Sequence, residues 1–201
     1  MRIIAGKYRS RLLEAPRGMT TRPTSDRLRE TLFNVIAPRI EGARFVDLFA
    51  GSGAVGIEAI SRGANFVWMV ENAQPALRAI RENLTSLKIA AGCRVEERSA
   101  MGALEGMLKR GEKANIIFLD PPYESAEEYV RVLGLLGSER GLALLEEDAR
   151  VIVEHRAKEA LEKSYGALEQ IRRLKQGDAA LSFYAVRSAV SSSGDASGSG
   201  V

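Results

Sequence analysis

The chain contains very little of the residues from which disulfides, metal clusters and histidine-dependent active sites are built. Its 201 residues include one cysteine, Cys93, and one histidine, His155. A single cysteine excludes an internal disulfide framework and a cysteine-based metal cluster. A single histidine excludes Ser-His or Cys-His catalysis unless His155 itself serves it. We interpret both residues as structural, with a surface position or an RNA contact as the alternatives for His155, and we expect no bound metal.

Long apolar runs are also missing. No stretch approaches the ~18 apolar residues of a membrane span, and the start, Met1 to Lys7, is too soon charged to be a signal peptide. With 45% hydrophobic and 27% charged residues, the composition is typical of one ordinary soluble domain with room for a small extension. We therefore expect a cytoplasmic protein that has no contact with a membrane.

The net charge of +3 conceals an uneven distribution along the chain. Residues 1–44 contain ten Lys and Arg against four acidic residues, a balance of +6, so residues 45–201 carry −3. A basic segment on a mildly acidic domain is typical of a part that contacts phosphate, although a solvated charged face would also give this pattern. The candidates for phosphate contacts are Arg2, Lys7, Arg9, Arg11 and Arg22.

The stretch from Asn115 to Tyr123, Asn-Ile-Ile-Phe-Leu-Asp-Pro-Pro-Tyr, predicts a buried strand that ends at a functional carboxylate. Its four consecutive apolar residues are typical of a strand covered on both faces of a parallel sheet. Pro121 and Pro122 remove two backbone donors, so the ladder cannot continue past Asp120. In open α/β sheets, ligands bind at the carboxyl ends of the strands. A plain strand end followed by a rigid loop is the alternative interpretation.

This arrangement suits recognition of a planar amino group. The nitrogen lone pair of an aromatic amine is delocalised into its ring, so the amine is a poor nucleophile. The Asp120 carboxylate and the Pro121 carbonyl can accept hydrogen bonds from its two N–H groups and hold the nitrogen in place. Tyr123 can stack on the base that carries the amine, a contact worth roughly 1–3 kcal/mol.

A glycine loop follows an earlier strand, residues 44–49. Residues 51–56 read Gly-Ser-Gly-Ala-Val-Gly, which fits the dinucleotide pattern Gly-x-Gly-x-x-Gly, a weak motif when it stands alone. Asp47 lies just before the loop, where it can accept from a cationic amino group. Glu71 ends the next strand, where an acid can accept from both hydroxyls of a ribose. An amino group, an adenosine and no pyrophosphate fit S-adenosylmethionine better than NAD.

The remaining pattern predicts strands that alternate with helices and then a closing hairpin, hence an α/β sandwich around a mostly parallel sheet. Residues 2–15 read as a basic β-hairpin, and a helix runs from about Ser25 until Pro38 ends it. Two late strands, 165–174 and 179–186, are joined by a turn at 176–178. We expect an extension at residues 1–24, one domain at 25–187 and a disordered tail at 188–201.

These motifs together resemble the class I S-adenosylmethionine-dependent methyltransferases. Asp47-Leu-Phe-Ala-Gly-Ser-Gly is similar to their first motif, Glu71 to their second and Asp120-Pro-Pro-Tyr123 to their amino-methylating motif. The starting residues Met-Arg-Ile-Ile-Ala-Gly-Lys-Tyr-Arg, the stretch Arg22 to Asn34 and the stretch Gly177 to Tyr184 resemble the RsmD-like 16S rRNA (guanine-N2) methyltransferases. The resemblance covers about residues 1–187 in the expected order.

The resemblance implies a Rossmann-like, seven-stranded sheet with an antiparallel C-terminal hairpin and a small N-terminal β-hairpin extension. It also implies methyl transfer to one guanine of 16S rRNA during small-subunit assembly, and it suggests a monomer. The implied cofactor-binding residues are Thr24, Asp47, Ala50, Gly51, Ser52, Gly53, Glu71, Asn72, Ser99 and Ala100. The implied catalytic residues are Asp120, Pro121, Pro122 and Tyr123. Ser99 stands where this class often has an acid that accepts from the adenine amino group.

Two other interpretations stay open. The acceptor can be adenine N6 in DNA or RNA, or the side-chain amide of a protein glutamine, because all are planar amines or amides. The basic N-terminal residues disfavour a protein, and the Arg22 to Asn34 stretch disfavours DNA. A non-catalytic RNA-binding module of the same fold would need a broken cofactor site, and the residues of that site look intact in the sequence.

Overall fold

The computed structural model describes residues 1–16, 26–121 and 126–187. Several expectations lie outside these residues: those for Arg22, Thr24, Pro122, Tyr123 and the tail 188–201. The first half of the described chain contains α1 (Asp26–Ile40), β1 (Arg44–Asp47), α2 (Ala54–Ser61), β2 (Phe66–Glu71), α3 (Gln74–Ser86), β3 (Cys93–Glu97) and α4 (Ala100–Arg110). The second half contains β4 (Ala114–Leu119), α5 (Ala126–Leu136), α6 (Glu139–Leu142), β5 (Leu145–Arg156), β6 (Ser164–Tyr165), β7 (Leu168–Gln176) and β8 (Ala179–Val186).

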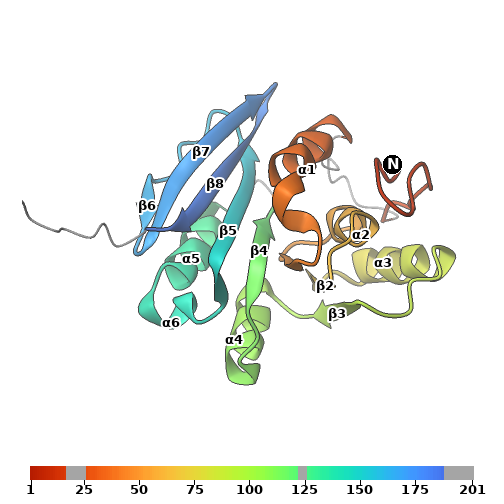
Figure 1. The fold of residues 1–201 in the computed structure, drawn as a ribbon, viewed down its shortest axis with the longest axis horizontal. Helices are drawn as coiled ribbons and strands as arrows, with labels where there is room; N and C mark the ends of the chain where they lie inside the picture. Colours follow the sequence, from red (N-terminus) through yellow and green to blue (C-terminus); the bar gives the residue numbers. More distant parts are fainter. Residues whose placement is uncertain (17–25, 122–125, 188–201) are drawn as a thin grey trace, which may run out of the picture.

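The strands form one mixed sheet in the order β3-β2-β1-β4-β5-β8-β7-β6 (Figure 1). The first five strands in this order, β3, β2, β1, β4 and β5, are parallel to one another. The last three are antiparallel to their neighbours: β8 to β5, β7 to β8 and β6 to β7. After β1 the chain moves outward to β2 and β3, then returns to place β4 on the other side of β1. The order therefore reverses between β1 and β4, which is where an open α/β sheet forms its ligand crevice.

Helices cover both faces of the sheet, and the alternation of strand residues explains why. Phe45 belongs to the apolar core beneath α1, α2 and α3, whereas its neighbour Val46 belongs to the core beneath α4 and α5. The same alternation separates Ile116 from Ile117 in β4. Continuous apolar runs are needed because neither face of a central parallel strand meets water.

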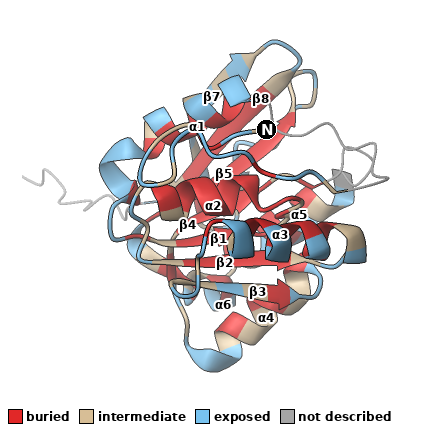
Figure 2. Cartoon of the chain, turned by 90° about the vertical axis from the view of Figure 1, so that its right-hand side faces the viewer, coloured by how far each residue is buried: buried red, intermediate tan, exposed pale blue. Residues whose placement is uncertain are grey.

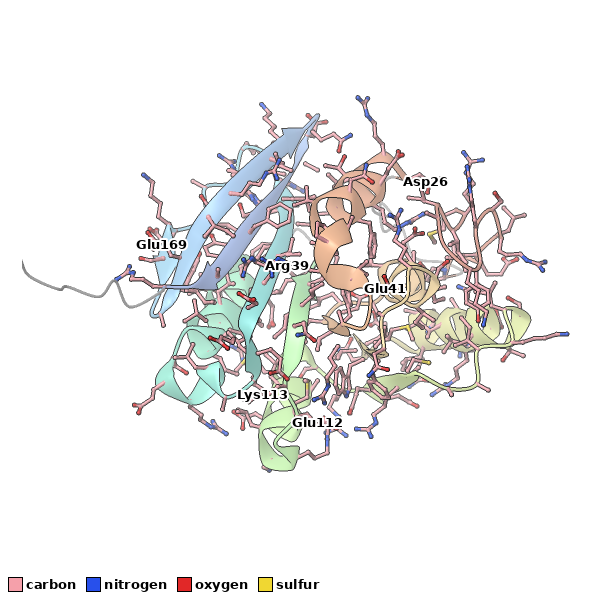
Figure 3. All side chains as sticks on the ribbon, in the orientation of Figure 1. Asp26, Arg39, Glu41, Glu112, Lys113 and Glu169 are labelled. Atoms are coloured by element: carbon pink, nitrogen blue, oxygen red, sulfur yellow. The ribbon has the colours of Figure 1, made fainter. Side chains whose placement is uncertain are left out.

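Burial is concentrated in the central strands and in the helix faces turned toward them (Figure 2). Charged side chains lie around the outside, among them the exposed Asp26, Arg39, Glu41, Lys113 and Glu169 (Figure 3).

Three details differ from the sequence-based expectation. The sheet has eight strands rather than seven, because the predicted strand 165–174 is two strands, β6 and β7. The chain turns between them at Gly166, where φ is +57°, a conformation that glycine adopts without steric cost. Helix α1 continues to Ile40, two residues beyond Pro38, so the predicted end of this helix was wrong.

The N-terminal segment, residues 1–16, pairs with itself as expected, although the ladder is minimal. One antiparallel bridge joins Arg2 to Leu12. The Ile3 N–H donates to the Arg11 carbonyl at 2.9 Å, and the Leu13 N–H donates to the Met1 carbonyl at 3.0 Å. Ile3 and Leu13 are buried against the core beneath α1 to α3, so this segment is packed on the domain.

Candidate functional site

Three acidic residues come from the carboxyl ends of three adjacent parallel strands. Asp47 is the last residue of β1, Glu71 is the last residue of β2, and Asp120 directly follows β4. β1 lies between β2 and β4, with Asp47 opposite Met69 on one side and Phe118 on the other. The carboxyl ends of parallel strands meet at one edge, so the fold gathers at one place residues that are up to 73 positions apart.

Asp47 is the most perturbed of the three. Its side chain is only 1% exposed. The pKa of this carboxyl is raised from 3.8 to about 7: burial is the largest cause, the negative charges of Asp120 and Glu71 also raise it, and the Gly56 N–H lowers it. Because Asp120 and Glu71 both act on Asp47, the three carboxylates share one electrostatic environment. Such a raised pKa is common where a site is arranged for function.

Only one of the two carboxylate oxygens of Asp47 has a hydrogen-bond partner within the described part of the chain. The Gly56 N–H donates to Oδ2 at 3.0 Å, whereas Oδ1 is buried without a donor. A buried acceptor without a partner costs about 1–3 kcal/mol. The position therefore suits a ligand that brings a positively charged N–H group to Oδ1.

The glycine loop opens α2 beside this carboxylate. Gly51 and Gly53 have φ values of +54° and +80°, which side chains rarely adopt. The Gly53 N–H donates to the Ala50 carbonyl at 2.7 Å and closes the turn. At Gly56, an added Cβ would lie 2.6 Å from Met69 Cγ, so this glycine allows α2 to pack closely on β2. The three glycines thus have different tasks, and Ser52 lies buried between the first two.

Glu71 connects the end of β2 to the glycine loop. Its Oε2 accepts from the Gly51 N–H at 2.9 Å, and its Oε1 accepts from the Asn72 and Ala73 N–H groups, both at 2.8 Å. A carboxylate offers about four acceptor directions, and three are used here. The carboxylate must therefore reorient, or exchange a backbone partner, to accept from both hydroxyls of a ribose.

The predicted adenine-edge residues stand at the end of β3. Ser99 is exposed and begins α4 as its N-cap, its hydroxyl accepting from the Gly102 N–H at 3.2 Å. Ala100 is buried against the core beneath α4 and α5. Because Ser99 Oγ already caps the helix, an adenine amino group would share this acceptor with the Gly102 N–H.

On the β4 side, Asp120 is half-buried and Pro121 is buried. The Leu48 N–H donates to the Phe118 carbonyl at 3.0 Å, so β4 stays hydrogen-bonded to the β1 side up to two residues before Asp120. The structure therefore brings Asp120 and Pro121 to the same edge as Asp47. The expectations for Pro122 and Tyr123 stay predictions, since both lie outside the described residues.

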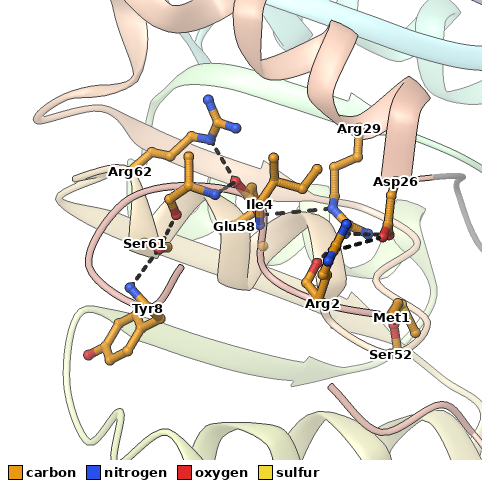
Figure 4. Close-up of polar contacts among 12 residues, drawn as sticks. Met1, Arg2, Ile4, Tyr8, Asp26, Arg29, Ser52, Glu58, Ser61 and Arg62 are labelled. Carbon is orange, nitrogen blue, oxygen red and sulfur yellow. Dashed lines mark hydrogen bonds and ion pairs between the residues drawn. The ribbon is translucent and has the colours of Figure 1, made fainter. Parts of the chain in front are cut away.

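The basic N-terminal segment is fixed to the domain by buried polar groups that sequence reasoning missed. Glu58, in the middle of α2 and 0% exposed, accepts from the Ile4 and Ala5 N–H groups at 2.7 and 3.0 Å. The fully buried Arg29 of α1 donates to the Arg2 carbonyl and approaches Glu58, 3.9 Å away (Figure 4). Glu58 is the only charged residue of the otherwise largely apolar helix α2, and this is the sequence feature that could have indicated such an anchor.

The N-terminal segment carries four of the five predicted phosphate contacts, Arg2, Lys7, Arg9 and Arg11, and all four side chains are exposed. The segment also reaches the glycine loop, because the Ser52 hydroxyl lies 3.5 Å from Met1 Sδ. The exposed cations and the site edge therefore belong to one connected part of the molecule.

His155 and Cys93 do not contribute to this site. His155 is buried, with Nε2 2.9 Å from Ser182 Oγ and Nδ1 2.9 Å from the Arg156 carbonyl, and burial lowers its pKa. Cys93 is half-buried at the start of β3, and burial raises the pKa of its thiol. Within residues 1–16, 26–121 and 126–187, no three His, Cys, Asp or Glu side chains are grouped so that they could hold a metal ion.

Among the described helices, none has the length and apolar character that crossing a membrane requires.

The sheet order, the glycine loop after β1 and the antiparallel end of the sheet define the Rossmann-like fold of class I methyltransferases. A solved structure titled "Putative methyltransferase yhhF from Escherichia coli" superimposes with a TM-score of 0.75 at 35% identity, over 92% of this chain and 96% of that chain. The predicted fold class is confirmed, apart from the additional short strand β6.

The chain belongs to the family described as "Conserved hypothetical protein 95", which matches residues 1–185. A relative in Bacillus subtilis (strain 168), named "Putative rRNA methyltransferase YlbH", is 37% identical over 93% of this chain and 100% of that protein. "Ribosomal RNA small subunit methyltransferase D" of Escherichia coli (strain K12) is 42% identical over 66% of each chain. The resemblance to the RsmD-like proteins is thereby confirmed.

Proposed function

We propose that this protein is an S-adenosylmethionine-dependent methyltransferase that modifies the exocyclic N2 amine of a guanine in 16S rRNA. The observation that carries the proposal is the meeting of Asp47, Glu71 and Asp120 at the carboxyl edge of β2, β1 and β4. One of these carboxylates has a buried acceptor without a donor among the described residues, as a site for a cationic amino group requires. The relatives named as small-subunit rRNA methyltransferases support the choice of substrate.

The residues around Asp47 suit the proposed cofactor. Asp47 Oδ1 would accept from its α-amino group, and the positive-φ turn at Gly51 and Gly53 leaves backbone space beside it, since no atom lies within 4 Å of a Cβ placed at Gly51. Glu71 would hold the ribose hydroxyls after releasing a backbone partner. Ser99 and Ala100 lie at the next strand end, where the adenine edge would lie.

The chemistry that the cofactor supplies when bound is an electrophilic methyl group. Asp120 and the Pro121 carbonyl would accept from the two N–H groups of the guanine amine and fix the nitrogen. Alignment of this kind is worth up to roughly 7–11 kcal/mol in well-oriented systems. As the new N–C bond formed, the methyl–sulfur bond would break and release S-adenosylhomocysteine, and the nitrogen would lose a proton to Asp120 or to water. The guanine must leave its stack to reach this edge, and Tyr123 is the proposed stacking partner.

The exposed Arg2, Lys7, Arg9 and Arg11 would contact the RNA backbone. Neutralised phosphates release counterions, so binding should weaken steeply as salt increases. A small ribosomal subunit, complete or in assembly, is the proposed substrate particle.

The test is transfer of a tritiated methyl group from labelled S-adenosylmethionine to four acceptors: small subunits from a strain that lacks the enzyme, naked 16S rRNA, plasmid DNA and protein. We expect label only in 16S rRNA, at guanine N2 when the digested RNA is analysed by mass spectrometry. Label in DNA, in adenine or in glutamine would replace this substrate with one of the other planar amines or amides. Cofactor binding without transfer to any acceptor would indicate a non-catalytic RNA-binding module.

The matched pair of variants is Asp120→Asn and Asp148→Asn. Asp120→Asn should lower transfer at least about 100-fold, within the range for loss of an acid–base or anchoring group, while binding of S-adenosylhomocysteine persists. Asp148→Asn changes an exposed acid near the amino end of β5, at the other end of the parallel strands, and should leave transfer unchanged. Equal activity of the two variants would contradict the role of Asp120.

A further inference from the structure

Asn83 connects the N-terminal segment to the glycine loop. It lies on α3, 1% exposed, and its side chain makes three hydrogen bonds to backbone groups. Oδ1 accepts from the Glu14 N–H at 2.8 Å, and Nδ2 donates to the Glu14 carbonyl at 3.1 Å and to the Ser52 carbonyl at 3.0 Å. One amide group thus spans two segments that are 38 residues apart in the sequence.

The two ends of the N-terminal segment converge on the same loop residue. Glu14 reaches Ser52 through Asn83, and Met1 Sδ lies 3.5 Å from Ser52 Oγ. Ser52 stands between Gly51 and Gly53, the two positive-φ residues that shape the loop. A displacement of the segment would therefore act directly on the backbone of the proposed cofactor site.

The middle of the segment is anchored to α2, the helix that the glycine loop opens. Glu58 accepts from the Ile4 and Ala5 N–H groups, and the Ser61 hydroxyl accepts from the Tyr8 N–H at 3.0 Å and donates to the Ala5 carbonyl (Figure 4). Because these partners are buried or nearly so, loosening the segment would leave polar groups unpaired, at about 1–3 kcal/mol each. These contacts define a docked position of the segment, and any ligand that binds the docked position better than a loosened one favours it.

We propose that Asn83 is a positioning residue that couples RNA binding on the N-terminal segment to cofactor binding at the glycine loop. RNA bound to Arg2, Lys7, Arg9 and Arg11 stabilises the docked position of the segment. The segment then positions the Asn83 amide, and the hydrogen bond from Asn83 Nδ2 positions the Ser52 carbonyl. The two ligands then bind cooperatively, and by linkage each raises the affinity of the other by the same factor. This inference rests on the proposed function.

The experiment is equilibrium dialysis of tritiated S-adenosylhomocysteine, which binds without turnover, against the full-length protein. Small ribosomal subunits from a strain that lacks the enzyme are either added or omitted. For the unmodified protein we expect the subunits to lower the dissociation constant of S-adenosylhomocysteine about fivefold or more, since couplings between sites commonly span 5- to 150-fold. An unchanged dissociation constant would overturn the inference without the use of any variant.

Glu14 offers a matched pair of variants because its side chain is exposed while its N–H donates to Asn83. Glu14→Pro removes that N–H, whereas Glu14→Ala keeps it. We expect Glu14→Pro to bind S-adenosylhomocysteine normally without subunits and to show a smaller gain on their addition, because only the bond from Asn83 Nδ2 to the carbonyl of residue 14 is left. Glu14→Ala should keep the gain. If both variants keep it, the proposed path through Asn83 is wrong.

Asn83→Ala removes the contact with Ser52 as well, so the dissociation constant of S-adenosylhomocysteine should rise at least threefold even without RNA. Asp178→Asn is the control: it changes an exposed residue in the β7–β8 turn, outside the segment and the loop, and it should leave that constant unchanged. A purely structural role of Asn83 would lower thermal stability but not affinity in the folded protein. Failure of the proposed function is distinguishable, because it would show as no cofactor binding or no methyl transfer to 16S rRNA.

Discussion

Replacing Asp47 by asparagine should make the ligand-free protein more stable at alkaline pH. The pKa of Asp47 rises from 3.8 to about 7, chiefly by burial. Because the folded state holds its proton more tightly than the unfolded chain, this group contributes stability fully below about pH 4, and the contribution is lost as the pH rises to 7. One pKa unit corresponds to about 1.4 kcal/mol, so the full effect is on the order of 4 kcal/mol.

The assay is urea unfolding of the unmodified and Asp47→Asn proteins at pH 5 and pH 8. Asparagine can still accept from the Gly56 N–H, so the hydrogen bond at 3.0 Å can be retained. The stability difference between the two proteins should shift in favour of the variant by roughly 3 kcal/mol between these pH values. Asp178→Asn, an exposed change in the β7–β8 turn, should show no such shift.

Parallel curves of unfolding free energy against pH for Asp47→Asn and the unmodified protein would refute the reasoning.

The Asp47→Asn protein should also be stabilised less by ligand. A ligand that binds only the folded state stabilises it according to its concentration relative to the dissociation constant. S-adenosylhomocysteine should therefore stabilise the unmodified protein and have much less effect on Asp47→Asn. The gain in stability and the loss of binding would have one cause, the buried negative charge.

Three further predictions concern the glycine loop, the buried histidine and the exposed arginines. Gly53→Ala should lower the free energy of unfolding by about 1–3 kcal/mol, because φ is +80° and the new Cβ would lie 3.3 Å from an Ile80 atom. His155→Gln should remove a loss of stability that begins below about pH 6.5, because burial lowers the folded-state pKa and only the unfolded chain gains the proton there. Arg9→Gln and Arg11→Gln should each reduce the salt dependence of RNA binding by about one unit of slope.

Each of these predictions has a control within the chain. Gly134 lies exposed in α5 with open space at its Cβ position, so Gly134→Ala should raise stability by up to about 1 kcal/mol. The His155 effect is best measured in the Asp47→Asn protein, where the opposing titration of Asp47 is absent. Arg131→Gln, on the exposed face of α5, should leave the salt dependence of RNA binding unchanged. Equal results for a variant and its control would contradict the corresponding prediction.

The parallel part of the fold and the strand-end acids could be predicted because local patterns determine them. The run Ile116 to Leu119 requires burial on both faces, and Pro121 ends it. The turn at Gly166 was harder to predict, since the surrounding residues alternate as one strand would, and only its positive φ divides β6 from β7.

The anchoring of the N-terminal segment could not be read from the sequence. Glu58 and Asn83 bind backbone groups of Ile4, Ala5 and Glu14, which lie more than 50 residues away in the sequence. Nearly every residue has the same backbone N–H and carbonyl groups, so the sequence does not indicate which residue provides the partner. The basic composition of the segment predicted a surface for phosphate. It did not predict that buried polar side chains hold the segment against the helix that follows the glycine loop.

The short β6 has a consequence for how the protein behaves at high concentration. β6 pairs with Leu168 and Glu169 of β7, and the Gln170 N–H donates to the Lys163 carbonyl at 2.8 Å, while β7 continues to Gln176 at the border of the sheet. A long border strand is a template for pairing between molecules. In β7 the bulge between Gln170 and Arg172 interrupts the regular ladder, and Arg172, Arg173 and Lys175 add like charges that repel a second copy. Neutralising these three residues would remove a barrier to edge-to-edge aggregation, without any change at the proposed catalytic edge.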